Sequence, residues 1–175
     1  MDIKSKIRRV PDFPKRGVVY RDITTLLQDP QAFRHVIKRM VDHYSDKGID
    51  KIVAAESRGF IFGSVLAHEL GKPFILLRKP GKLPWKTVRH EYTTEYSTDA
   101  LEMHEDAIGK GDKILLLDDL LATGGTMEAS VRMIEKQGGK VAGIGFIIEL
   151  SFLNGRKRLE GYDVFSLVDY RSGDE

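Results

Sequence analysis

The first clear pattern in the chain is a helical repeat of hydrophobic positions between residues 33 and 44. The apolar side chains recur at spacings of three and four positions, which places them on one face of a helix. Asp29 is a suitable N-cap for this helix, Pro30 suits its first turn, and Gly48 is expected to end it. The segment therefore predicts an amphipathic helix.

Short apolar runs without alternation lie between the helical patterns of the chain. Runs of this kind are typical of strands that are covered on both faces. We expect strands at residues 51–56, 73–78, 113–117 and 141–148, and further helices at residues 61–70 and 126–137. Strands that alternate with helices of this length indicate a parallel sheet with helices on both faces, so the predicted fold class is α/β.

One segment departs from this alternation of strands and helices. Residues 88–104 are more polar, and apolar and polar side chains alternate along them. Ser97, Thr98 and Asp99 have the composition of a turn, so the segment predicts a partly exposed antiparallel hairpin. We expect this hairpin to lie outside the main core.

Length and charge favour a single domain over residues 1–175 and argue against several classes of partner. The chain has 175 residues, of which 41% are hydrophobic and 31% charged, and its formal net charge is +2. A charge this small is not typical of a dedicated nucleic-acid binder, and the apolar runs are too short to cross a membrane. With no cysteine and no apolar leader, the sequence favours a cytoplasmic location.

The segment that follows Leu117 combines two features that suit a phosphorylated sugar. In open α/β sheets, ligands bind beyond the carboxyl ends of the strands. Small residues and two glycines allow backbone N–H groups to line a concavity there, and the next helix adds partial positive charge at its N-terminus. Asp118 and Asp119 offer acceptor oxygens to the paired hydroxyls of a ribose. We expect the phosphate cradle at Ala122, Thr123, Gly124, Gly125 and Thr126.

The sequence does not contain the competing phosphate-binding motifs. It has no Gly-x-x-x-x-Gly-Lys-Ser/Thr, and no Gly-x-Gly-x-x-Gly follows the first predicted strand. A P-loop ATPase and a dinucleotide enzyme are therefore disfavoured. Taken alone, Gly124 and Gly125 are also compatible with an ordinary turn between a strand and a helix, preceded by solvated carboxylates.

The string from residue 114 to residue 126 resembles the phosphoribosyl-pyrophosphate signature of the type I phosphoribosyltransferases. Further blocks are similar to those of the adenine-specific members, in the same order: residues 12–14, 17–24, 57–60, 78–84 and 92–96. The resemblance implies a single-domain fold with an antiparallel lid at about residues 79–106 and a base-binding segment near the N-terminus. Tyr20 departs from the pattern, because a phenylalanine is common at that position.

The same resemblance implies a reaction and its partners. Phosphoribosyl would pass from 5-phosphoribosyl pyrophosphate (PRPP) to adenine, giving AMP and pyrophosphate. Mg²⁺ would be bound mainly through the substrate, with no certain protein ligand. The resemblance also suggests a homodimer, and it gives no role to nucleic acid or to a membrane.

Two catalytic residues follow from the resemblance. Glu95, in the predicted hairpin, would act as the acid/base group that accepts the proton of the purine nitrogen. Arg58 would reach the purine or its developing charge, although a cation is unfavourable at the start of a helix. Ser57 would lie at the pyrophosphate site. Members of the family use a cis peptide bond there, and the sequence alone does not decide whether the bond between Glu56 and Ser57 is cis.

Cations and a base pocket complete the set of candidate residues. Pyrophosphate departs with several negative charges, which Arg78, Lys79 and Lys82 would stabilise; a solvated basic loop is the alternative for such a run. Leu150 is equally compatible with a place in the core. The candidates for base binding are Val19, Tyr20, Arg21 and Leu150.

Two other functions remain as alternatives at this stage. One is a regulator that keeps the sugar-pyrophosphate site but binds DNA or RNA, although such proteins usually carry an added helix-turn-helix module or a large basic face. The other is a transferase for a different base, such as xanthine, a 6-oxopurine or orotate. A 6-oxo group would require a hydrogen-bond donor near the base edge, and no donor can be assigned to that place from the sequence.

Overall fold

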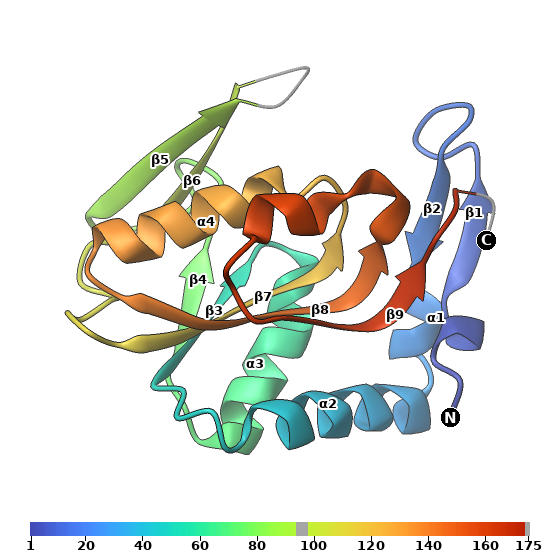
Figure 1. The fold of residues 1–175 in the computed structure, drawn as a ribbon, viewed down its shortest axis with the longest axis horizontal. Coiled ribbons are helices and arrows are strands. Elements are labelled where there is room, and N and C mark those ends of the chain that lie inside the picture. The colour runs from blue at the N-terminus through green and yellow to red at the C-terminus, as the bar shows by residue number, and fades with distance from the viewer. Residues whose placement is uncertain (94–97, 174–175) are drawn as a thin grey trace.

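The framework of the protein, in a computed structural model that describes residues 1–93 and 98–173, is a five-stranded parallel sheet (Figure 1). The strands, in spatial order, are β4 (Phe74–Leu77), β3 (Lys51–Ala55), β7 (Lys113–Leu121), β8 (Lys140–Leu150) and β9 (Val164–Tyr170). Every neighbouring pair is parallel, so the carboxyl ends of the strands lie at the same edge of the sheet. The α/β class is thus confirmed, with β7 in the middle of that edge.

Helices cover both faces of the sheet. They are α1 (Thr24–Leu27), α2 (Pro30–Tyr44), α3 (Arg58–Leu70) and α4 (Gly125–Lys136), with short 3₁₀ segments η1 (Lys4–Lys6), η2 (Ser151–Leu153) and η3 (Gly155–Leu159). Figure 1 shows α2 and α3 on one face of the sheet and α4 on the other. Each face has its own apolar core: Phe62 and Leu66 of α3 are buried in one, and Met127 and Ile134 of α4 in the other. This burial on both faces explains why the strands are apolar without alternation.

Helix α2 begins as predicted and ends earlier than predicted. The Asp29 carboxylate accepts hydrogen bonds from the backbone N–H groups of Gln31 and Ala32, at 3.0 and 3.1 Å. The helix ends at Tyr44, so the prediction that Gly48 ends it is wrong. Gly48 instead has a φ of +63° in the turn that leads to β3, a conformation that favours glycine.

Strand β7 is longer than the sequence predicts. Its pairing with β8 continues past Leu117, with Leu120 opposite Ile148 and Leu121 opposite Glu149. This main-chain pairing outweighs the low strand propensity of aspartate. Asp118 and Asp119 therefore lie in a strand rather than in the loop that follows it.

The hairpin of residues 88–104 is present as strands β5 (Thr87–Thr93) and β6 (Thr98–His104), which pair in antiparallel fashion. Two details of its prediction are wrong. Thr98 and Asp99 belong to β6 instead of the turn, and Ser97 lies outside the described residues. The hairpin also does not lie outside the core, because Leu101 and Met103 are buried in the same core as α4. Strand β6 joins the edge of the sheet through backbone hydrogen bonds between Arg78 and Glu102, at 2.9 and 2.7 Å.

A second antiparallel hairpin lies near the N-terminus and follows no pattern singled out in the sequence. Its strands are β1 (Arg8–Pro11) and β2 (Val19–Asp22), with Val10 opposite Tyr20. Figure 1 shows this hairpin beyond β9, at the opposite end of the molecule from β5 and β6. Among residues 1–93 and 98–173, none of the helices has both the length and the apolar character required to span a bilayer.

The contact between α3 and the sheet yields a prediction about stability. A Cβ added at Gly63 would lie 2.8 Å from the Ala54 Cβ and 2.8 Å from the Phe74 ring. We expect Gly63→Ala to lower the free energy of unfolding by about 1–3 kcal/mol despite the higher helix propensity of alanine, because Ala54 cannot move out of the way. Ser64→Ala, at the next and exposed position, is the control and should be neutral or slightly stabilising. Denaturant unfolding measures both, and a Gly63→Ala protein as stable as wild type would contradict the close packing.

Candidate active site

The loop between β7 and α4 is concave and has the features that suit an anion. Gly124 precedes the first residue of α4 with a φ of +84°, and among the described residues no side chain caps this end of the helix. The first backbone N–H groups of α4 are thus available to a ligand, at the positive end of the helix dipole. A cavity of about 90 Å³ lies over the loop, lined by residues 122–127 together with Asp118, Leu120, Leu121 and Phe146. The structure therefore brings all five residues of the expected phosphate cradle to one cavity.

The hairpin of β5 and β6 borders the same loop. The Tyr92 hydroxyl lies 3.2 Å from the Thr126 Oγ1, within hydrogen-bond distance. Partial burial raises the pKa of the Tyr92 hydroxyl above its ordinary value. The predicted lid segment is therefore in contact with the anion site.

The two carboxylates at the end of β7 are held in an electrostatically unfavourable place. Asp119 is 3% exposed, and the Asp118 Oδ1 accepts a hydrogen bond from the Asp119 backbone N–H at 2.8 Å. Burial raises the pKa of Asp118 well above its ordinary value, and the neighbouring Asp119 charge adds to this effect. Burial also raises the pKa of Asp119, although Arg58 acts in the opposite direction.

Arg58 connects three segments that are distant in the sequence. As the first residue of α3, it places its Nε 2.9 Å from the Asp119 Oδ2 of β7. Its Nη1 donates a hydrogen bond to the Tyr20 hydroxyl of β2, and its guanidinium lies over the Tyr20 ring, 5.2 Å from the centroid. The Asp119 carboxylate explains how a cation is tolerated at a helix N-terminus.

A larger cleft, of about 550 Å³, lies next to the anion site and shares Asp118 and Leu120 with it. The peptide bond between Glu56 and Ser57 at this cleft is cis, which the sequence alone did not decide. Its remaining lining residues are Tyr20, Glu56, Ser57, Arg58, Lys79 and Asp119. The two cavities are therefore neighbours that meet at Asp118 and Leu120, and the larger one brings the acidic pair together with the side chain of Tyr20.

The three candidate cations do not all face this cleft. Lys79 lines it, whereas the exposed Lys82 is absent from its lining in the described part of the chain. Arg78 is paired with Glu56, with its Nε and Nη2 at 3.3 and 3.1 Å from the Glu56 Oε2. The Lys79 backbone N–H donates to the other oxygen of Glu56. Glu56 therefore holds the basic loop at the cleft, a role that sequence reasoning missed.

The candidate base-binding residues also separate in space. Tyr20 lines the larger cleft and Val19 lies half-buried beside it on β2. The Arg21 side chain is buried away from the cleft, with its guanidinium over the Tyr170 ring, 4.3 Å from the centroid. Leu150 packs against the core at the end of β8.

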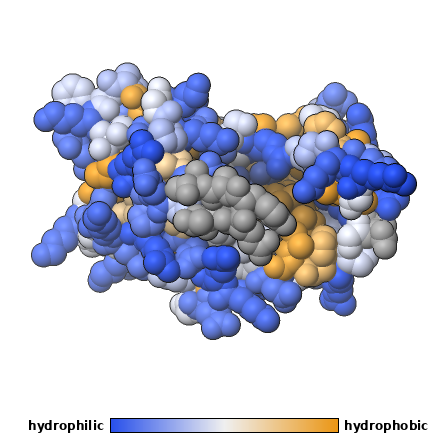
Figure 2. Space-filling model, turned by 90° about the horizontal axis from the view of Figure 1, so that it is seen from above, coloured by the Kyte–Doolittle hydropathy of each residue, from blue (hydrophilic) through white to orange (hydrophobic). Residues whose placement is uncertain are grey.

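On the face seen in Figure 2, an apolar area lies toward the side of the β1–β2 hairpin, whereas most of the remaining coloured surface is hydrophilic.

Two residues remain, the expected acid/base group and a glycine that contacts the anion loop. Glu95, the expected acid/base group, lies outside the described residues. Gly155 of η3 was missed by sequence reasoning, yet it is buried against the anion loop. The dipeptide of Asn154 and Gly155 was the available signal for a tight turn there, but such a signal does not reveal what the turn contacts.

Comparisons with known proteins identify what this chain resembles. The profile of the phosphoribosyl transferase domain matches residues 22–171. An adenine phosphoribosyltransferase of Thermotoga neapolitana is 55% identical over 170 residues, which cover 97% of this chain and 100% of that protein.

Solved structures give the same result. The crystal structure of an adenine phosphoribosyltransferase from Thermoanaerobacter pseudethanolicus superposes with a TM-score of 0.93 at 48% identity, over 97% of this chain and 98% of the other. The enzyme of Giardia lamblia, crystallised with 9-deazaadenine, has a TM-score of 0.92 at 36% identity, over 98% and 97% of the two chains.

The raised pKa of Asp118 predicts that this residue lowers stability at neutral pH. A carboxyl whose pKa is raised by folding favours the folded state below the ordinary aspartate pKa, and this advantage is lost as the pH rises. We therefore expect Asp118→Asn to raise the free energy of unfolding by about 1 kcal/mol at about pH 7.5, and the gain to shrink toward about pH 4.5. Denaturant titration at both pH values measures it.

Asp112→Asn is the matched control for this experiment. Lys51 lies 2.8 Å from the Asp112 carboxylate, and the hydrogen bond from Lys51 lowers the pKa of Asp112. Asp112→Asn should consequently lower the free energy of unfolding at neutral pH, the opposite of the effect expected for Asp118→Asn. A loss of stability in Asp118→Asn at neutral pH would contradict the electrostatic account of the acidic pair.

Proposed function

The chain belongs to the phosphoribosyl transferase domain family, and on this premise we propose that it transfers the phosphoribosyl group of PRPP to adenine. The C1–O bond to pyrophosphate breaks, a bond from C1 to a purine nitrogen forms, and that nitrogen loses its proton. The products are AMP and pyrophosphate. The observation that carries the proposal is the pair of neighbouring cavities, which share Asp118 and Leu120 and bring the anion loop, the acidic pair and Tyr20 close together.

The anion loop binds the 5-phosphate and the acidic pair binds the sugar. Backbone N–H groups at residues 123–126 surround the phosphate, where the dipole of α4 favours negative charge. Asp118 and Asp119 accept hydrogen bonds from the two ribose hydroxyls, which cost less to place beside buried carboxylates than a second anion would. These contacts fix C1 of the sugar in the larger cleft.

The cations of the larger cleft serve the departing pyrophosphate. Lys79 and the Ser57 hydroxyl contact its oxygens, while Arg78 keeps the basic loop in place through Glu56 and Lys82 approaches when the loop closes. Developing negative charge is thereby stabilised where it forms. Arg58 positions the purine beside Tyr20 and stabilises the charge that the base acquires.

The donor atoms of the site fit Mg²⁺ that is held mainly by the substrate. The described residues contain no group of three or more His, Cys, Asp or Glu side chains that could hold a metal ion. Asp118 offers hard oxygen atoms at the cleft, whereas Asp119 is already paired with Arg58. Mg²⁺ is suited to bind phosphate oxygens together with water and few carboxylates, and it would neutralise charge on the pyrophosphate.

The base site combines an aromatic face with backbone groups. The Tyr20 ring, which lines the larger cleft, stacks on the purine, with Val19 beside it on β2. Backbone groups near Val19 and Arg21 bind the amino edge of adenine. Glu95 accepts the proton of the purine nitrogen, and closure of the hairpin over the site excludes water that would otherwise hydrolyse the activated sugar.

The assembly and location follow from the same family membership. The protein works as a homodimer in the cytoplasm, as a single domain over residues 1–175, and needs neither a nucleic acid nor a membrane. Apolar side chains on β4 and α3 offer a surface for the second copy; the exposed fraction is 37% for Leu76 of β4 and 36% for Ile61 of α3.

The choice of base is the first test of the proposal. Adenine, guanine, hypoxanthine and xanthine are offered in parallel with PRPP and Mg²⁺, and pyrophosphate release is measured. We expect kcat/KM for adenine to exceed that for each oxopurine by about 100-fold or more, since an unpaired oxo group at the amino edge is rejected strongly. Preference for an oxopurine would overturn the assignment of substrate.

The role of Glu95 is tested by Glu95→Gln. Loss of the proton acceptor should lower kcat by about 100-fold or more, with a change in unfolding free energy within about 0.5 kcal/mol. Glu91→Gln is the control, because Glu91 is an exposed residue of β5 whose carboxylate pairs with Arg89 at 2.9 Å. Glu95 has no part in the mechanism if its variant turns over within twofold of the Glu91 variant.

A further inference from the structure

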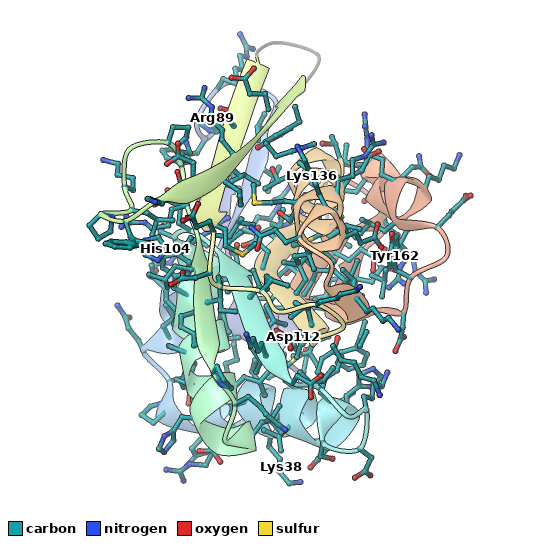
Figure 3. The ribbon with its side chains drawn as sticks, turned by 90° about the vertical axis from the view of Figure 1, so that its left-hand side faces the viewer. Lys38, Arg89, His104, Asp112, Lys136 and Tyr162 are labelled. Atoms are coloured by element: carbon teal, nitrogen blue, oxygen red, sulfur yellow. The ribbon has the colours of Figure 1, made fainter. Side chains whose placement is uncertain are left out.

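The anion loop rests on a segment that the reaction itself does not use. This segment, residues 155–162, is called the strap below; it contains η3 and follows η2 along the chain. Figure 1 shows η3 beside α4, and in Figure 3 the labelled Tyr162 lies next to that helix. A Cβ added at Gly124 would lie 2.6 Å from the Gly155 carbonyl oxygen, and one added at Gly155 would lie 2.3 Å from the Ala122 carbonyl oxygen. Loop and strap therefore pack main chain against main chain, with no space for a side chain.

An ion pair between the exposed Arg156 and the buried Glu149 fixes the strap to the sheet. Arg156 donates two hydrogen bonds to Glu149 of β8, from Nε to Oε1 and from Nη2 to Oε2, both at 2.7 Å. Glu149 is 5% exposed and also accepts a hydrogen bond from the Ser166 hydroxyl at 2.6 Å, while the Arg156 Nη1 donates to the Val164 carbonyl oxygen at 2.8 Å. A two-point pair of this kind has a defined geometry, so it sets the position of the adjacent Gly155.

The other side of the strap is attached to α4. The Arg158 Nη1 lies 3.0 Å from the Glu128 Oε2, and the Tyr162 hydroxyl donates to the Glu135 Oε1 at 2.7 Å. Leu159 is 1% exposed and belongs to the core beneath α4. The strap is thus held by strand β8 on one side and by the helix that begins at the anion loop on the other.

We propose that Arg156 and Glu149 are positioning residues for the 5-phosphate. By holding Gly155 against Ala122 and Gly124, the pair keeps the loop in its phosphate-binding geometry before the substrate arrives. Such preorganisation lowers the ordering cost of binding, because the loop has fewer conformations to lose. The inference rests on the proposed function. It limits the effect on affinity to the 5-phosphate, since none of the described residues that line the larger cleft belongs to the strap.

The test compares two ligands that the proposed function places in different cavities, the phosphate in the smaller one and the pyrophosphate in the larger one. Isothermal titration calorimetry gives the Kd of ribose 5-phosphate and, separately, of pyrophosphate with Mg²⁺. Arg156→Lys keeps the charge but removes the two-point contact with Glu149. We expect it to raise the Kd of ribose 5-phosphate about tenfold, as a misplaced binding loop does, and to leave the Kd of pyrophosphate within about twofold.

Two further variants make the result decisive. Gly155→Ala leaves the ion pair in place, but its added methyl group pushes on Ala122. It should raise the Kd of ribose 5-phosphate and leave the Kd of pyrophosphate unchanged, as Arg156→Lys does. If this variant does not fold, Arg156→Lys carries the test. Lys157→Met, which removes the exposed neighbouring cation, is the control and should bind both ligands as wild type does.

The possible outcomes separate the inference from the proposed function. Unchanged affinity of Arg156→Lys for ribose 5-phosphate, or an equal loss for both ligands, overturns the positioning role. A wild-type protein that makes no AMP from adenine and PRPP overturns the proposed function instead, whatever the variants bind.

Discussion

The ion pair between Arg58 and Asp119 is the interaction on which the arrangement of the site depends. A buried carboxylate without a partner is costly, so the place of Asp119 at the end of β7 determines where the Arg58 guanidinium lies. Arg58 in turn contacts Tyr20 through a hydrogen bond and through the face of its ring. A strand in the middle of the sheet, the start of α3 and the N-terminal hairpin are thereby joined at one point. This contact fixes the position of Tyr20 relative to the acidic pair.

The acidic pair is better explained by binding than by stability. Burial raises the pKa of both carboxyls, so each carboxylate is less favourable in the folded chain than in water. Their place in a paired strand, rather than in a mobile loop, keeps the oxygens in one geometry. A ligand that brings hydroxyl donors or a cation relieves the unfavourable burial and gains affinity from it. The strand therefore maintains an unfavourable arrangement, which the proposed function explains by the hydrogen bonds that two ribose hydroxyls would donate to these carboxylates.

Local chemistry determined which features could be predicted from the sequence. The N-cap Asp29 and the helical spacing after it act over a few residues, and the string of residues 114–126 carried enough chemistry to predict a group of residues that line one cavity. The end of β7 was misplaced because pairing with β8, a distant segment, decides where that strand stops. The same holds for the burial of Met103 and for the contact of Gly155 with the loop, since both depend on segments brought together only by the fold.

The central claim is that the two neighbouring cavities bind a nucleoside monophosphate in a single orientation, and a crystal structure of the protein with AMP tests it most directly. The account predicts the phosphate at the backbone N–H groups of residues 123–126, the ribose hydroxyls on Asp118 and Asp119, and the adenine ring on Tyr20. AMP bound in the reverse orientation, or with its phosphate away from the loop between β7 and α4, would contradict it.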